Sequence, residues 1–252
     1  MLDSRVTGFF LDRLFITGAT PPAAVQPLVG HARAGRFDEI LAELGNLSPA
    51  AAREVAPVFL HGLALLARRD LEAAAARFRE SLRLDSEFFP AAFFLGACYA
   101  AGGRDREAVG AWQTSLVAED EAPFVWTLLG DALLRLNEGV QAAEILREAA
   151  SLWPEDDQIR VRLGLAYVMS GGGADALATL DPYFDRHPED HARLFVAMRL
   201  LYEATAAGRP VGTAAEDLAR FTRYARSYAA AGGPQIALVE QWHRFLESRS
   251  RQ

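Results

Sequence analysis

Residues 123–156 read PFVWTLLGDALLRLNEGVQAAEILREAASLWPED, and this stretch decides the fold. The turn-forming residues Asn137-Glu138-Gly139 lie near its middle, where glycine tolerates a positive φ. We expect a short helix on each side of this turn. The stretch is one of four related units of 34 residues, which span 55–88, 89–122, 123–156 and 157–190.

Small and large residues recur at fixed places in these units. Each unit has a glycine in its first half, an alanine twelve residues later and a large apolar residue four further on. These residues are Gly62, Gly96, Gly130 and Gly164, then Ala74, Ala108, Ala142 and Ala176, then Phe78, Trp112, Leu146 and Leu180. Glycine and alanine have almost no side chain, so we expect the two helices of each unit to approach closely where they cross. One hairpin cannot bury its apolar faces alone, which predicts that the units stack.

The clearest unit resembles the tetratricopeptide repeat, whose 34-residue signature is W-x2-L-G-x2-Y, then A-x3-F, then P. The matching residues in 123–156 are Trp126, Leu129, Gly130, Leu133, Ala142, Leu146 and Pro154. The other units depart from the signature at Val58, Ala92 and Arg160, where it has tryptophan, and at Ser86 and Asp120, where it has proline. The resemblance implies an all-α fold, a right-handed superhelical solenoid of stacked antiparallel helix hairpins.

The regions outside 55–190 carry weaker versions of the pattern. Residues 1–20 form an apolar N-terminal segment or cap, and residues 21–54 form a degenerate repeat with Gly35 at the turn. Residues 191–248 begin as a divergent repeat and continue as C-terminal capping helices. Terminal units of a solenoid are expected to be atypical because they close the stack.

Composition excludes several classes of protein. The 252 residues carry a net charge of −7 and are 51% hydrophobic, which argues against disorder and against nucleic-acid binding. All basic residues are arginine, which we attribute to the base composition of a bacterial genome. No apolar run is long enough to span a membrane, and residues 1–20 do not resemble a secretory signal. We expect a cytoplasmic protein, or a periplasmic one if the chain is a fragment of a longer protein.

Candidate catalytic residues are few. Cys98 is the only cysteine and is expected to be a small buried hydrophobe. The segment His187-Pro188-Glu189-Asp190-His191 has two histidines four residues apart, but Pro188 places His187 in the turn that ends a unit. We therefore predict no enzyme, no cofactor and no metal. A metal-dependent enzyme that uses His187 and His191 is the less favoured alternative.

The resemblance implies that the first helices of successive units line a concave face that binds a partner. The predicted partner-binding residues are Phe59, Leu63, Leu66, Phe93, Ala97, Leu134, Arg135, Val161, Arg162, Leu165, Val168, Phe195 and Arg199. This face is mainly apolar in its N-terminal half. The arginines could receive a carboxylate or a phosphate, or be neutralised by Asp131 and Glu203.

A large exposed apolar face is usually covered. It could receive a peptide or helix of a protein partner, or a second copy of this chain in a homodimer. It could also be filled by the apolar segment 8–16, or be buried between adjacent first helices. The preferred function is a non-enzymatic protein-interaction or scaffold module, with self-association as an alternative.

Overall fold

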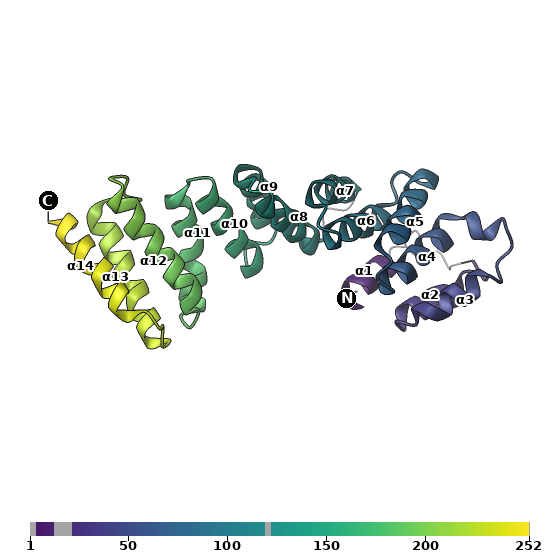
Figure 1. The fold of residues 1–252 in the computed structure, drawn as a ribbon, viewed down its shortest axis with the longest axis horizontal. Coiled ribbons are helices and arrows are strands. Elements are labelled where there is room, and N and C mark those ends of the chain that lie inside the picture. Colours follow the sequence, from purple (N-terminus) through teal and green to yellow (C-terminus); the bar gives the residue numbers. More distant parts are fainter. Residues whose placement is uncertain (1–3, 13–21, 119–121, 252) are drawn as a thin grey trace. The chain divides into compact units, whose positions relative to one another are not determined.

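The computed structural model describes residues 4–12, 22–118 and 122–251. Within these ranges the chain forms fourteen α-helices and one short 3-10 helix, and it contains no β-strand (Figure 1). The prediction of an all-α fold is therefore confirmed for the part of the chain that the structure describes.

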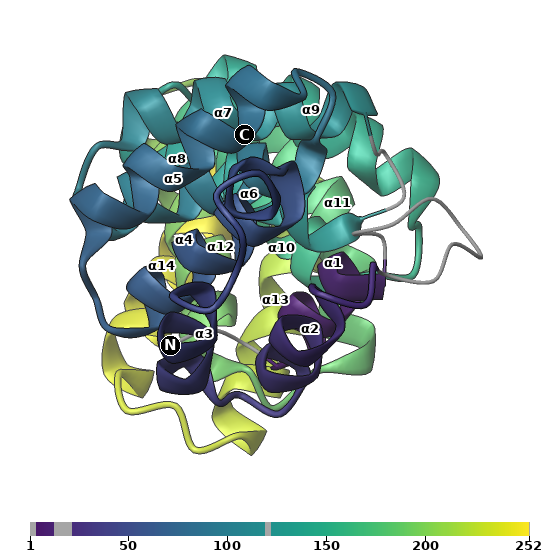
Figure 2. The same cartoon turned by 90° about the vertical axis from the view of Figure 1, so that its right-hand side faces the viewer.

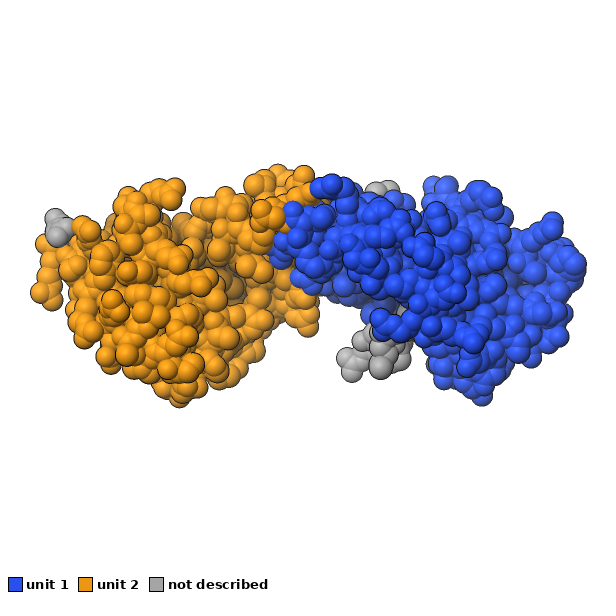
Figure 3. All heavy atoms as spheres, in the orientation of Figure 1, with its two compact units in different colours: residues 1–136 blue, residues 137–252 orange. Residues whose placement is uncertain are grey.

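The chain divides into two units in the turn between α8 and α9 (Figure 3). Unit 1, residues 1–136, contains α1 (Ser4–Asp12), α2 (Gln26–Arg33), α3 (Phe37–Leu44), the 3-10 helix (Ala51–Arg53), α4 (Val55–Ala67), α5 (Leu71–Leu84), α6 (Phe89–Ala101), α7 (Asp105–Ala118) and α8 (Pro123–Arg135). Unit 2, residues 137–252, contains α9 (Gly139–Leu152), α10 (Asp157–Met169), α11 (Gly173–Arg186), α12 (His191–Ala206), α13 (Ala214–Ala230) and α14 (Ile236–Ser250).

Each helix packs against the next one along the chain. In unit 1 this holds from α1 to α8, and in unit 2 it holds from α9 to α14. Helices two apart also touch at α4 and α6 and at α12 and α14, because one hairpin lies on the next. This order of contacts is that of a helical solenoid, as the sequence predicts.

A left-handed backbone conformation recurs every 34 residues, in the turn after each first helix. The residues are Gly35 (φ 68°), Arg69 (62°), Gly103 (74°), Asn137 (61°) and Gly171 (83°). Arg69 and Asn137 adopt this conformation although it is unfavourable for residues with a side chain. Gly35 belongs to the same series, so the α2–α3 hairpin keeps the turn geometry of the four clear 34-residue repeats.

The repeated glycines lie beneath the large side chain of the same 34-residue repeat. A β-carbon on Gly62 would come within 2.6 Å of Phe78, and one on Gly96 within 2.5 Å of Trp112. The large residue packs against the glycine of its own hairpin, and this contact sets how closely the two helices approach. Phe78 also stacks on Phe94 of the next 34-residue repeat, with ring centroids 5.8 Å apart.

Each unit has its own apolar core. The core of unit 1 contains a cluster of phenylalanine rings from α1, α4, α5 and α6, among them Phe10, Phe59, Phe78 and Phe94. The core of unit 2 is built from α11 to α14 and includes Met198, Phe221, Tyr224, Tyr228 and Trp242. Cys98 is buried in unit 1, and this burial raises the pKa of its thiol to about 12.

The outer helices depart from the 34-residue register. The helix α12 ends at Ala206, and α13 begins only at Ala214, after the segment that contains Gly208-Arg209-Pro210. None of the helices in the described part of the chain has the length and apolar character that crossing a bilayer requires.

Candidate functional site

Three of the predicted partner-binding side chains in unit 1 are interior residues. Phe59 and Leu63 on α4 are fully buried, and Phe93 on α6 is nearly so. The Phe59 ring packs against those of Phe78 and Phe94, with centroids 5.7 Å apart in both pairs. The expectation of an open apolar wall needs correction at Phe59, Leu63 and Phe93, because neighbouring helices cover these side chains.

The short helix α1 covers Phe93. Its Phe10 side chain is only 1% exposed, and the Phe10 ring centroid lies 4.4 Å from that of Phe93 and 5.7 Å from that of Phe124. Phe9 meets Phe124 edge to face at 5.2 Å. Of the apolar segment 8–16, residues 8–12 therefore fill this part of the face as a helix, and residues 13–16 lie outside the described residues.

The other predicted residues of unit 1 are more accessible. Leu66, Ala97 and Leu134 are half-buried, and Arg135 is exposed. Arg135 donates to both carboxylate oxygens of Asp105 at the start of α7, with N···O distances of 2.6 to 3.1 Å. These hydrogen bonds raise the pKa of Arg135, with a smaller electrostatic contribution from Asp131. From the sequence, Asp131 and Glu203 are the residues expected to neutralise the arginines, so the direct partner of Arg135 is not predicted.

The predicted residues of unit 2 form a more open surface. Leu165 on α10 is 46% exposed, and Met169 lies exposed one helical turn further on. Arg199 on α12 is exposed and lies 3.7 Å from Glu203 in an ion pair. The remaining predicted residues are half-buried: Val161, Arg162, Val168 and Phe195.

A hollow of about 500 Å³ lies at one end of this surface, where α10, α11 and α12 meet. Val168 lines one side of the hollow and Leu200 lines another, while Glu203 and Arg209 supply charged groups. The turn Gly171-Gly172-Gly173 also lines it, so the backbone there comes close to any bound group. The hollow is large enough for one or two apolar side chains of a partner.

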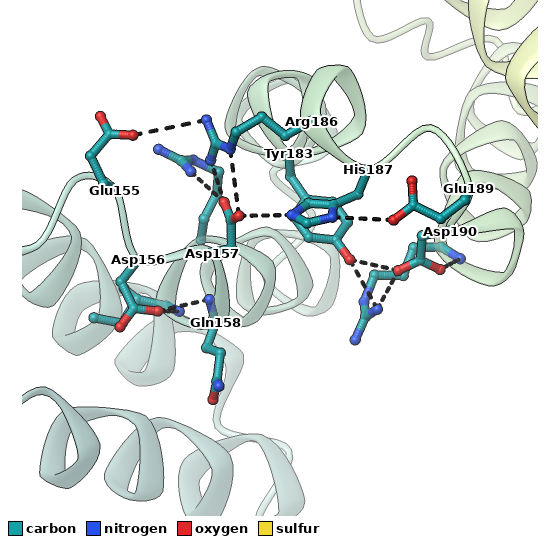
Figure 4. Close-up of polar contacts among 12 residues, drawn as sticks. Glu155, Asp156, Asp157, Gln158, Tyr183, Arg186, His187, Glu189 and Asp190 are labelled. Carbon is teal, nitrogen blue, oxygen red and sulfur yellow. Dashed lines mark hydrogen bonds and ion pairs between the residues drawn. The ribbon is translucent and has the colours of Figure 1, made fainter.

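A polar junction lies at the other end of α10 and α11 (Figure 4). Asp157 accepts hydrogen bonds from Arg186 and from Arg160, and its Oδ2 lies 2.9 Å from His187 Nε2. Hydrogen bonds from Arg186, and then from His187 and Arg160, lower the pKa of Asp157 to about 2. The pKa of His187 is raised, chiefly by its hydrogen bond with Asp157. The junction ties two neighbouring helices together through charge.

The two histidines of the segment 187–191 have different partners. His187 lies between Asp157 and Glu189, and its Nδ1 is 3.3 Å from Glu189 Oε1 (Figure 4). The His191 ring instead faces Tyr228, with centroids 6.3 Å apart. Among the residues that the structure describes, no group of three or more His, Cys, Asp or Glu side chains could hold a metal ion.

Comparison with known proteins identifies the repeat. Residues 133–201 match the family model of the tetratricopeptide repeat. This part of the chain therefore carries the tetratricopeptide repeat. No curated protein matches the sequence.

Solved structures share the fold of this chain. YrrB, described as a TPR protein with an unusual peptide-binding site, has 20% identity and a TM-score of 0.61 over 81% of this chain and 96% of YrrB. MamA AMB-1 has 21% identity and a TM-score of 0.56 over 64% of this chain and 95% of MamA. Naa15/Naa10 bound to HypK-THB has 15% identity and a TM-score of 0.62 over 91% of this chain and 36% of that chain.

Tetratricopeptide-repeat proteins are typically protein-interaction modules and are generally not enzymes. The predicted face is brought together here in two separate pieces, one in each unit. In unit 1, α1 covers its most apolar part, and in unit 2 the α10 and α12 side chains are accessible. Met169 occupies a concave position by the same repeat rule. Leu200 extends the accessible part beyond the predicted residues, and its place beside the hollow is visible only in the structure.

Proposed function

We propose that this protein is a non-enzymatic interaction module that binds a peptide or helix of a partner protein on the first helices of unit 2. The exposure of Leu165 and Met169, one turn apart on α10, carries this proposal. Two exposed apolar side chains at this spacing form a stripe that suits the apolar side of a helix or an extended peptide.

The hollow beside this stripe supports the same function. Its apolar side chains, Val168 and Leu200, provide a place for an anchoring side chain, and the charged residues Glu203 and Arg209 can orient polar groups of the partner. Covering about 300 Å² of apolar surface would favour association by several kcal/mol at ~25 cal/mol per Å², before the entropic costs of binding.

A matched pair of substitutions tests the proposal. Leu165→Glu places a charge on the stripe, and Leu152→Glu makes the same change on α9 at a side chain that is 49% exposed. Leu152 is the control because its exposed fraction is close to that of Leu165. It lies on the second helix of a hairpin, whereas the proposed binding surface lies on first helices. Neither substitution should lower the melting temperature by more than about 2 °C.

The readout is affinity capture from a lysate of the source cells, followed by mass spectrometry. We expect a protein that the wild type and Leu152→Glu retain and that Leu165→Glu loses. The proposal is wrong if every retained protein is retained equally by Leu165→Glu. Light scattering of the purified chain at several concentrations shows whether the retained partner is a second copy of the chain itself.

A further inference from the structure

We propose that the apolar face of unit 1 beneath α1 is a second docking site, which opens when α1 leaves and then accepts an amphipathic helix of a partner that carries two adjacent aromatic residues. This site lies in unit 1 and does not rest on the function proposed for the stripe on α10.

The face beneath α1 is an aromatic surface. Phe10 lies at its centre, with ring centroids 4.4 Å from Phe93, 5.3 Å from Phe94 and 5.8 Å from Phe89. The Phe93 and Phe124 rings also meet edge to face, 5.5 Å apart, so the surface is continuous from α6 to α8. Without α1 this cluster would lose its cover, and an uncovered aromatic surface favours another apolar group in the same place.

The helix α1 is a weak element on its own. It has nine residues, carries Gly8 near its middle and has no acidic residue in its first turn. Isolated helices of this length are marginal in water, and glycine lowers helix propensity further. The helix therefore depends on its contacts with the rest of unit 1, among which it lies beside α2 (Figures 1 and 2).

Those contacts are imperfect on the side of α1 that faces α2 and α3. Thr7 is only 4% exposed, yet its hydroxyl oxygen has no hydrogen-bond partner. An open pocket of about 210 Å³ lies beside it, lined by Thr7, Leu11, Ala32 and Phe37 among others, so α1 is not closely packed against α2 and α3 there. A buried hydroxyl without a partner in the protein weakens the docking of α1. The ion pair between Asp12 and Arg33, at 2.7 Å, is exposed on both sides and holds α1 only weakly.

The bound α1 shows what the site selects. Its Phe9 and Phe10 rings sit next to each other and contact Phe124 and Phe93 respectively. A partner helix with two adjacent aromatic residues can make the same edge-to-face and tilted contacts. A longer or glycine-free helix would form them at a lower cost in conformational entropy, and would therefore compete with α1.

Two substitutions at one position change how stably α1 docks on unit 1 without altering the aromatic face. Gly8→Pro breaks α1, because proline in a helix interior removes a hydrogen bond and clashes with the preceding turn. Gly8→Ala strengthens α1, because nothing lies within 4 Å of a β-carbon at this position and alanine favours the helix. The pair thus shifts the same equilibrium in opposite directions.

The probe is a synthetic, fluorescein-labelled peptide of residues 4–12 with capped ends, and the readout is fluorescence anisotropy with each full-length variant. The attached α1 competes with the probe at a high effective concentration in the wild type. We expect Gly8→Pro to bind the probe at least ~10-fold more tightly than the wild type, and Gly8→Ala to bind it no better than the wild type. A probe with alanine at both phenylalanine positions should bind none of them.

Equal binding of the probe by all three proteins, or no binding by Gly8→Pro, overturns the proposal. If circular dichroism shows that Gly8→Pro unfolds more than α1, Asp12→Arg replaces it, because it turns the attraction to Arg33 into repulsion. It must give the same ranking, with a smaller difference from the wild type because the ion pair is exposed. Light scattering tests whether a second copy of this chain, rather than a partner helix, occupies the site. A dimeric wild type that becomes monomeric in Gly8→Pro would identify a second copy of this chain as the occupant and would contradict the assignment to a partner helix.

Discussion

The Phe78 ring lies directly against Gly62, so closely that a β-carbon on Gly62 would come 2.6 Å from the ring edge. The same relationship holds between Gly96 and Trp112. In each case the glycine belongs to the first helix of a hairpin and the large residue to the second. The absence of a side chain on one helix thus makes room for the largest side chain of the other.

Gly62→Ala should therefore destabilise unit 1. The added methyl group has to displace the Phe78 ring, which is fully buried and in contact with other phenylalanine rings. Overpacking of this kind costs about 2 kcal/mol in the free energy of unfolding, measurable by urea denaturation. Gly110→Ala on α7 is the control, because no atom lies within 4 Å of its β-carbon. We expect Gly110→Ala to stabilise the protein by up to about 1 kcal/mol, and a similar effect of both changes would contradict the steric argument.

At equivalent turn positions, introducing a glycine should stabilise the protein and removing one should destabilise it. Arg69→Gly relieves a positive φ of 62°, and Gly103→Ala introduces a side chain at a φ of 74°. The first change should raise the free energy of unfolding by about 0.5–1 kcal/mol, after the greater freedom of glycine in the unfolded chain is allowed for. The second should lower it by about 1 kcal/mol. Thermal melting of the two single variants checks the signs, and a loss of stability in Arg69→Gly would show that its side chain has an unrecognised role.

The repeat made the fold predictable from the sequence. The sequence predicts turns at Gly35 and at Asn137-Glu138-Gly139, and both Gly35 and Asn137 adopt the left-handed conformation in the structure. A turn of this kind depends on local backbone preferences, and local preferences are visible in a sequence. The packing of Phe78 on Gly62 was only half predicted, because the spacing shows that the two residues recur together but not which helix the ring covers.

Whether the predicted face is open or covered could not be predicted from the sequence. The pattern places Phe93 on a first helix, but whether another element covers that side chain depends on a contact with Phe10, which is far away along the chain. The same limit applies to Arg135, whose partner Asp105 lies in the preceding 34-residue repeat of unit 1. Contacts between successive repeats depend on how the hairpins stack, and that geometry comes only from the structure.

The polar junction of unit 2 should make stability depend on pH. The pKa of His187 is raised by its hydrogen bond with Asp157, so its contribution is fully present below the unfolded value of 6.5 and is lost as the pH rises through the folded value. We expect His187→Gln to cost stability at pH 5 and to cost less at pH 9, as measured by urea denaturation at both values.

His61 provides the contrast, because burial lowers its pKa and the sign is reversed. The wild type gains stability as the pH rises through the folded value of His61 towards 6.5, so His61→Gln should compare best with the wild type at pH 5. At the polar junction, the additional effect of His187→Gln should depend less on pH in the Asp157→Asn background, where only Glu189 still raises the pKa of His187. A pH dependence that survives undiminished in this background would exclude Asp157 as its main cause.

The carboxylate of Asp217 should hold the irregular segment between α12 and α13. Asp217 is buried, and its two oxygens accept hydrogen bonds from the backbone N–H groups of Val211 and Gly212 at 2.9 and 3.0 Å. Asp217→Ala leaves both donors without a partner and opens a small cavity, which should cost about 2–4 kcal/mol in the free energy of unfolding. Asp217→Asn keeps the volume but can accept only one of the two hydrogen bonds, so its cost should be smaller than that of Asp217→Ala. The control is Glu216→Ala, which removes the exposed hydrogen bond that the Thr213 backbone N–H donates and should cost less than Asp217→Ala. Hydrogen exchange of the Val211 and Gly212 amides provides a local readout, and unchanged protection in Asp217→Ala would contradict the role assigned to this carboxylate.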